Sequence, residues 1–214
     1  MIDKGRKLFI ANCATCHGLA LQGSTTGPSL IGVGAASVDF QVGTGRMPLA
    51  QDAPQAPDKP VIFDRDETVA MAEYVQSIAP GPDFPPEEYL ALDGDATRGA
   101  ELFRINCAMC HNVAGAGGAL TQGKYAPPLQ ETAPRHIYNA MLTGPQNMPV
   151  FNDENLTPQD KQDIITAIKY NVANEQVAGF NLGSLGPVAE GLFLWIFGLG
   201  AIIAFCVWLT AKAS

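Results

Sequence analysis

The chain has few basic residues, few histidines and few tryptophans. Its 214 residues include 13 Lys and Arg against 21 Asp and Glu, a formal net charge of −8, with three His and two Trp. A nucleic-acid binder normally needs a basic face that neutralises phosphates, so this balance argues against nucleic acid as a partner. Hydrophobic residues make up 47% of the chain, which excludes a wholly disordered protein.

The N-terminal residues MIDKGRKLF contain no apolar run, whereas the C-terminal end does. Residues 191–211, GLFLWIFGLGAIIAFCVWLTA, are 21 consecutive residues without a charge. As a helix rising ~1.5 Å per residue they span about 32 Å, close to the ~30 Å of a hydrocarbon core. Trp195 and Trp208 lie toward the two ends, where interfacial rings are favoured. A core helix apolar on every face is rare in a small soluble protein, so we predict one transmembrane helix over residues 188–211.

The remaining chain is a duplicated module. GRKLFIANCATCH at residues 5–17 recurs as GAELFRINCAMCH at residues 99–111, an offset of 94. Further matches preserve their order while the offset grows, as loop insertions in a repeat would cause. These later matches pair GPSL with APPL and TGRMP with TGPQNMP, at residues 27–30, 126–129, 44–48 and 143–149.

Each copy ends in a helical pattern. Asp64 and Glu67 form a candidate capping box before the first helix, and Thr157 precedes Pro158 at the start of the second. The intervening segment is Pro-rich and acidic, too punctuated to be helical throughout. We therefore predict an all-α fold in five parts: module 1 over 1–80, a linker over 81–95, module 2 over 96–178, a Gly-rich tether over 179–187 and the transmembrane helix.

The Cys-x-x-Cys-His sequence has three chemical interpretations. A thioredoxin-like redox pair needs a βαβ setting, and no strand pattern surrounds either copy. A zinc site needs a fourth ligand, and the remaining histidine is His136 alone. Covalent attachment of a c-type haem requires only the motif itself: two thiols on one helical turn bond the vinyl groups, and the adjacent imidazole reaches the iron. Two copies therefore predict two covalently bound haems c, attached at Cys13, Cys16, Cys107 and Cys110, with His17 and His111 as iron ligands.

A sixth ligand is expected on the opposite face of each haem, and a thioether suits low-spin iron. Met47 lies 30 residues after His17, and Met148 lies 37 after His111. Each methionine precedes a proline, which favours extended backbone. A single methionine is more often a core filler, but two Met-Pro pairs at corresponding repeat positions favour ligation. We expect His136 at the surface or beside a propionate, with displacement of Met148 as the alternative. Arg46 and Arg135 are candidate propionate partners or simply solvated.

These motifs resemble the cytochrome c fold, present twice over about 160 residues. The resemblance implies that Pro28 and Pro127 offer backbone oxygen to the proximal imidazoles and that Leu30 and Leu129 pack on the haems. Two haem modules, a tether containing LGSLGPVAEGL and a C-terminal helix further resemble the di-haem cytochrome cc subunit of actinobacterial menaquinol–cytochrome c reductase. That resemblance implies electron relay from the Rieske iron–sulfur protein, beside cytochrome b, to the copper centre of an aa-type oxidase in one supercomplex.

Haem c is attached outside the cytoplasm, so we expect a removed signal or an N-terminal anchor ahead of Met1. The haem modules would then be on the outer, periplasmic side of the plasma membrane, with Lys212 inside. Other functions remain open at this point. One is the electron-entry subunit of a cbb-type oxidase, although that subunit usually carries its anchor at the N-terminus. Another is the cytochrome subunit of a periplasmic dehydrogenase. The last is a di-haem peroxidase, which needs an open distal site.

Overall fold

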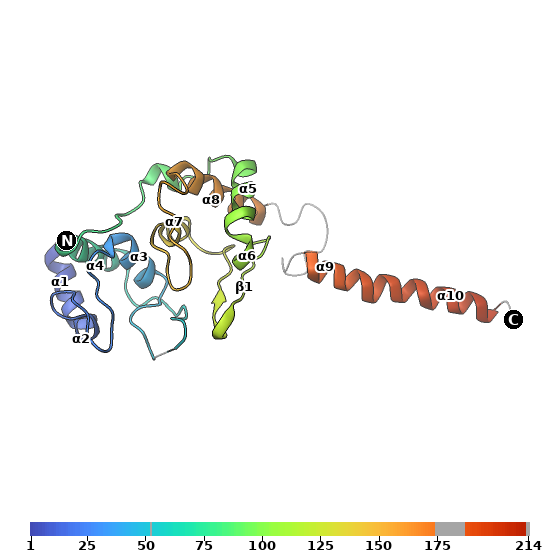
Figure 1. The fold of residues 1–214 in the computed structure, drawn as a ribbon, viewed down its shortest axis with the longest axis horizontal. Coiled ribbons are helices and arrows are strands. Elements are labelled where there is room, and N and C mark those ends of the chain that lie inside the picture. The colour runs from blue at the N-terminus through green and yellow to red at the C-terminus, as the bar shows by residue number, and fades with distance from the viewer. Residues whose placement is uncertain (52, 174–186, 213–214) are drawn as a thin grey trace.

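The structure is a computed structural model that describes residues 1–51, 53–173 and 187–212. Two small helical modules lie side by side, and a long C-terminal helix follows (Figure 1). The tether predicted over 179–187 lies outside the described residues except for Pro187, as does the end of module 2 beyond residue 173.

The first module is built on a crossing of its first and last long helices. Its helices are α1 (Ile2–Asn12), α2 (Ala14–His17), α3 (Gly34–Gly43) and α4 (Arg65–Ile78). Helices α1 and α4 meet at Gly5, where a Cβ would lie 1.8 Å from the carbonyl oxygen of Ala70. Only glycine permits this approach. The capping box predicted at Asp64 and Glu67 is confirmed: each side chain accepts a hydrogen bond from the other residue's backbone N–H.

The second module repeats this plan. Its helices are α5 (Ala96–Asn106), α6 (Ala108–His111), α7 (Pro134–Thr143) and α8 (Pro158–Ala173). Gly99 takes the place of Gly5, because a Cβ there would lie 1.9 Å from the backbone oxygen of Asp163. The inserted loop contains a feature that the sequence did not predict. A two-stranded antiparallel ribbon, β1 (Gly118–Ala119) and β2 (Tyr125–Ala126), flanks the 3₁₀ turn η2 (Thr121–Gly123).

The two modules are joined by a linker and by a direct contact between α3 and α7. In the linker, the 3₁₀ helix η1 (Glu87–Leu90) is the helical part of an otherwise irregular segment. At the contact, the fully buried carboxylate of Asp39 pairs with Arg65 of its own module and with Arg135 of the other at 3.7 Å. It also accepts a hydrogen bond of 2.8 Å from Asn139. One acidic side chain therefore ties α3, α4 and α7 together.

The C-terminal helix is long and apolar enough to cross a membrane. It consists of α9 (Pro187–Phe193), a π-helical stretch η4 (Leu194–Leu199) and α10 (Gly200–Lys212). Residues Val188–Lys212 form one candidate span of 25 residues with a mean hydropathy of 2.5. The mostly helical fold with two modules and one C-terminal apolar helix is confirmed. The boundaries assigned to the parts stay predictions.

Candidate haem-binding site

In the first module, the attachment motif spans the junction of α1 and α2. The α1 helix ends at Asn12, and Cys13 caps it before the short α2 turn presents Cys16 and His17. The Nδ1–H of His17 donates a hydrogen bond of 2.8 Å to the carbonyl oxygen of Pro28. This bond fixes the tautomer and leaves Nε2 with a free lone pair for a metal.

Cys13 and Leu30 pack against the same apolar cluster of the first module, which includes Phe9, Leu21 and Tyr74. Close backbone packing brings the Pro28 segment up to the motif. A Cβ at Gly27 would lie 2.7 Å from the carbonyl oxygen of Cys16, and the Ser24 hydroxyl donates to that oxygen at 2.6 Å. The segment around Pro28, whose carbonyl oxygen accepts the hydrogen bond from the imidazole, therefore packs directly against the turn that contains the cysteines.

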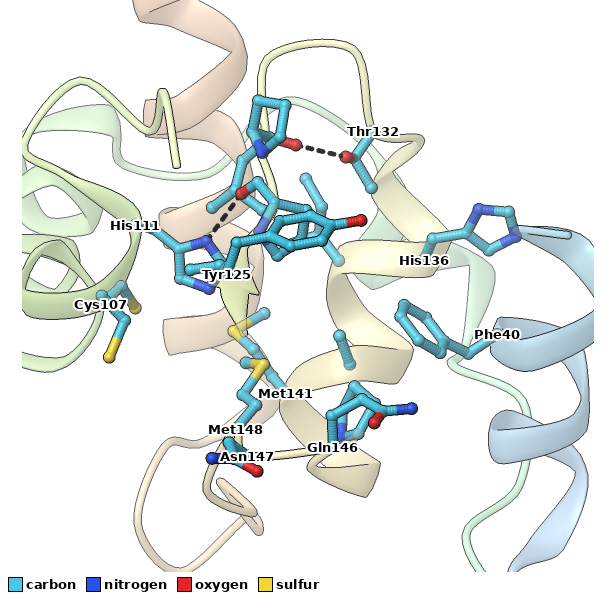
Figure 2. Close-up of a pocket in the computed structure, with 18 of the residues that line it drawn as sticks. Phe40, Cys107, His111, Tyr125, Thr132, His136, Met141, Gln146, Asn147 and Met148 are labelled. Carbon is cyan, nitrogen blue, oxygen red and sulfur yellow. Dashed lines mark hydrogen bonds between the residues drawn. The ribbon is translucent and has the colours of Figure 1, made fainter. Parts of the chain in front are cut away.

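The second module reproduces the same arrangement around α6. Cys107 caps α5, and the α6 turn presents Cys110 and His111. The Nδ1–H of His111 donates to the carbonyl oxygen of Pro127 at 3.0 Å (Figure 2). His111 is buried, and this burial lowers the pKa of its imidazole, so the ring is neutral and able to bind iron near neutral pH.

A cavity of about 530 Å³ opens in the second module beside this histidine. Its volume lies within the range of cofactor pockets, ~300–1,000 Å³. Leu129, Ile164, Ile168 and Met141 contribute apolar walls. Cys107 and His111 lie on one side, and Met148 enters from the loop after α7 on another (Figure 2). Cys110 also lines the cavity. The cavity thus offers two thiols, an imidazole and a thioether around one apolar space.

The two candidate methionines have different surroundings in the two modules. Met148 is half-buried and packs against the apolar cluster that contains Cys107 and Leu129. Met47 is also half-buried, on the segment after α3, where its backbone N–H donates to Gln41 at 2.9 Å. Ligation of iron by either methionine stays a prediction.

Burial acts on the attachment cysteines as well. Together with a smaller effect of the neighbouring motif cysteine, it raises the pKa of the Cys13 thiol to about 11 and that of the Cys107 thiol to about 12. The free thiols are therefore protonated and weakly reactive at neutral pH. Thioether formation would remove this buried thiol without leaving a charge behind.

The expected surface position of His136 is wrong, whereas a position beside a propionate stays a prediction, because His136 lines the cavity. Its side chain is 7% exposed and packs edge-on against Phe40 of the first module, with ring centroids 6.3 Å apart. Figure 2 shows the imidazole directed toward α3 rather than toward His111. Gly43 makes room for it, because a Cβ there would lie 2.8 Å from Nε2. Arg135, next to it, is paired with Asp39 and is not simply solvated.

Sequence reasoning missed several residues of the cavity wall. Tyr125, on β2, and Met141, which is 1% exposed, both line it. Phe40, Thr44, Gln55 and Asp58 also line it, although they belong to the first module. Met141 precedes Met148 by seven residues, and helical periodicity from Ile137 could have placed it on the buried face. The contributions from the first module leave no local signal in the sequence.

Comparison with known proteins agrees with this geometry. Residues 2–79 match the family described as "Cytochrome c", and residues 94–166 match "Cytochrome C oxidase, cbb3-type, subunit III". The "Cytochrome bc1 complex cytochrome c subunit" of Corynebacterium efficiens is 44% identical over 229 residues, covering 100% of this chain and 77% of that protein. The protein of the same name from Mycobacterium bovis is 45% identical over 220 residues, covering 100% and 79%. This chain belongs to the family of cytochrome bc1 complex cytochrome c subunits.

Membership in this family, with a cytochrome c domain in each half, means that two haems c are covalently bound. The residues fit the group: both motifs have their histidine oriented by a proline carbonyl, and the second has an apolar cavity of suitable size. A bound haem supplies one-electron chemistry between Fe(III) and Fe(II). The function of this cytochrome c subunit is accordingly electron transfer in a respiratory chain, and the apolar C-terminal helix fits a membrane anchor.

Proposed function

We propose that this subunit relays single electrons from the Rieske centre of a menaquinol-oxidising cytochrome bc complex to an aa-type cytochrome c oxidase. The observation that carries the proposal is the duplication itself. Two complete attachment sites lie on one chain with modules in direct contact through α3 and α7. A chain with two haem sites and its own anchor can bridge a donor and an acceptor without a diffusing carrier.

The proposed iron ligands are His17 with Met47 and His111 with Met148. Pro28 and Pro127 orient the imidazoles by accepting their Nδ1–H hydrogen bonds. Leu30 and Leu129 pack beside the attachment cysteines. A histidine and a methionine holding each iron would leave no position open to oxygen or peroxide, which favours electron transfer over peroxidase chemistry.

The proposed topology places both modules on the outer side of the plasma membrane and Lys212 on the cytoplasmic side. The requirement for haem attachment outside the cytoplasm supports this orientation. Rieske and cytochrome b subunits are the proposed partners on the donor side, and the oxidase is the proposed partner on the acceptor side. The relatives' printed name, which gives a cytochrome bc1 complex, supports the donor-side assignment.

A reduced-minus-oxidised spectrum of the full chain, purified by an affinity tag in mild detergent, tests this proposal. Haem b and haem a bands beside the haem c band would support a position between a quinol-oxidising complex and an oxidase. Haem b without haem a would support the assignment to a reductase and contradict the proposed supercomplex with an oxidase. Haem c alone would contradict the proposal, and rapid peroxide reduction by that material would favour a peroxidase.

A further inference from the structure

The haem cavity of the second module is closed in part by the first module. Residues 55–58 of the first module lie against the β-ribbon of the second: Gln55 Nε2 donates to the backbone oxygen of Tyr125 at 2.9 Å, and the Tyr125 N–H donates back to Gln55 Oε1 at 2.8 Å. The Tyr125 hydroxyl donates to the Asp58 carboxylate at 3.2 Å. With Phe40 and Thr44, these residues form one wall of the cavity.

Arg46 also belongs to this wall and carries a buried charge. It is 6% exposed, and its guanidinium lies over the Phe40 ring, 5.0 Å from the centroid. Within the described residues its side chain forms no hydrogen bond and no ion pair. The exposed carboxylate of Asp58 lies close enough to raise the pKa of Arg46, but burial, the larger effect, lowers it. The arginines Arg65, Arg98 and Arg135, by contrast, are each paired with a carboxylate.

A buried cation without a hydrogen-bonded carboxylate is costly, and the field of the exposed Asp58 carboxylate offsets the desolvation of Arg46 only in part. Arg46 faces the cavity that lies beside His111 and the attachment cysteines. A haem brings two propionate carboxylates into its pocket. A guanidinium pairs with a carboxylate through two parallel hydrogen bonds, so a propionate would supply the missing anion.

We propose that Arg46 of the first module binds a propionate of the haem held by the second module. The first module thereby contributes to the cofactor site of its neighbour and stabilises the reduced form of that haem, since a nearby cation favours the state with one more electron. Arg46 also directly precedes Met47, the predicted iron ligand of the first haem. One short segment would then contact both cofactors.

A redox titration of the Arg46→Gln variant tests the proposal, with the two haems distinguished spectrally. In a Cys110→Ser background the second haem keeps one vinyl group, so its α band moves and can be followed separately; Cys16→Ser marks the first haem in the same way. At a fixed ambient potential, we expect the reduced-to-oxidised ratio of the second haem to fall about tenfold in Arg46→Gln. For a one-electron couple this is about 59 mV. The first haem should change less than about twofold, the size expected for a screened charge.

Arg104→Gln is the matched control, because Arg104 is an exposed arginine on α5 of the second module, which holds the haem in question. It should change neither haem by more than about twofold, since an exposed charge is screened. Arg46→Lys keeps the charge and should hold the ratio within about threefold of the parent. It also provides the test if Arg46→Gln fails to fold.

Three results would overturn the proposal. One is a shift confined to the first haem, which would assign Arg46 to its own module. Another is a change in Arg46→Gln no larger than in Arg104→Gln. The last is a tenfold drop in Arg46→Lys, which would indicate lost packing on Phe40 rather than a lost charge.

Discussion

Met148 is the proposed iron ligand of the second haem, so its replacement provides a test at the level of one residue. Imidazole in place of a thioether lowers the potential of a haem, because a thioether favours the reduced iron. Met148→His should therefore lower one of the two midpoint potentials and leave the other in place, as read from a spectroelectrochemical titration. An unchanged titration in Met148→His would exclude Met148 as a ligand.

His136 should make stability depend on pH. Burial, followed by the positive charge of Arg135, lowers the pKa of His136 to about 4, although Asp39 opposes this. Unfolded histidine titrates near ~6.5, so the unfolded state takes up the proton first as pH falls. Stability from this residue is complete above pH ~6.5 and is lost progressively down to about 4, by on the order of 1–3 kcal/mol.

The measurement is the thermal unfolding midpoint of the full chain in mild detergent across this pH range. Carboxylates also titrate in part of this pH range and change the unfolding midpoint. The His136→Gln variant retains those carboxylates, so the difference between the parent and this variant reports on His136. The midpoint should fall more steeply between pH 6.5 and 4 in the parent than in the variant. Parallel curves would contradict the assignment of a buried neutral imidazole.

At the scale of elements, each module depends on a helix crossing that only glycine permits. Alanine normally stabilises a helix over glycine by ~1 kcal/mol. At Gly99, however, the added Cβ would lie 1.9 Å from the backbone of α8. We expect Gly99→Ala to destabilise the protein by about 1–3 kcal/mol or more through overpacking, measured as a lower unfolding midpoint. Gly198→Ala is the control, since nothing lies within 4 Å of a Cβ there. Equal midpoints for Gly99→Ala and the parent would contradict the crossing.

Helices α3 and α7 are held together through the buried carboxylate of Asp39. Replacement by Asn keeps the shape and removes the charge that Arg65 and Arg135 share. Because both arginines are partly exposed, we expect a loss of about 2 kcal/mol, below the 3–5 kcal/mol of a fully buried pair. The exposed pair of Asp3 and Lys7 offers a matched control, and Asp3→Asn should leave the unfolding midpoint nearly unchanged, because solvent screens an exposed pair. Similar losses in the two variants would show that Asp39 does not act as a buried hub.

Much of each module could be predicted from the sequence, because local rules decide it. The capping box at Asp64 and the start of α8 after Thr157 follow from side chains within three residues of each other. The attachment turns follow from the Cys-x-x-Cys-His spacing, and the proline acceptors follow from the family resemblance. The short β-ribbon was missed because strands of two residues are too short for an alternating pattern.

At the scale of the whole molecule, sequence reasoning gave the number of parts but not how they meet. The contact of α3 with α7 joins Asp39 to Asn139, 100 residues later, and Gln55 meets Tyr125 across 70 residues. No periodicity or motif in one sequence records such pairs. The surface position expected for His136 was wrong for this reason. A polar imidazole suggested exposure, but residues of the first module cover it.

The proposed relay requires that electrons pass from menaquinol to the oxidase through this subunit. The most direct test follows menaquinol-driven reduction of haem b, haem c and haem a in membranes from a strain that lacks the chain, with the full chain restored as control. If the proposed relay operates, haem b is still reduced without the subunit, haem a is not, and the restored chain recovers haem a reduction. Reduction of haem a at the control rate in the absence of the subunit would exclude the relay.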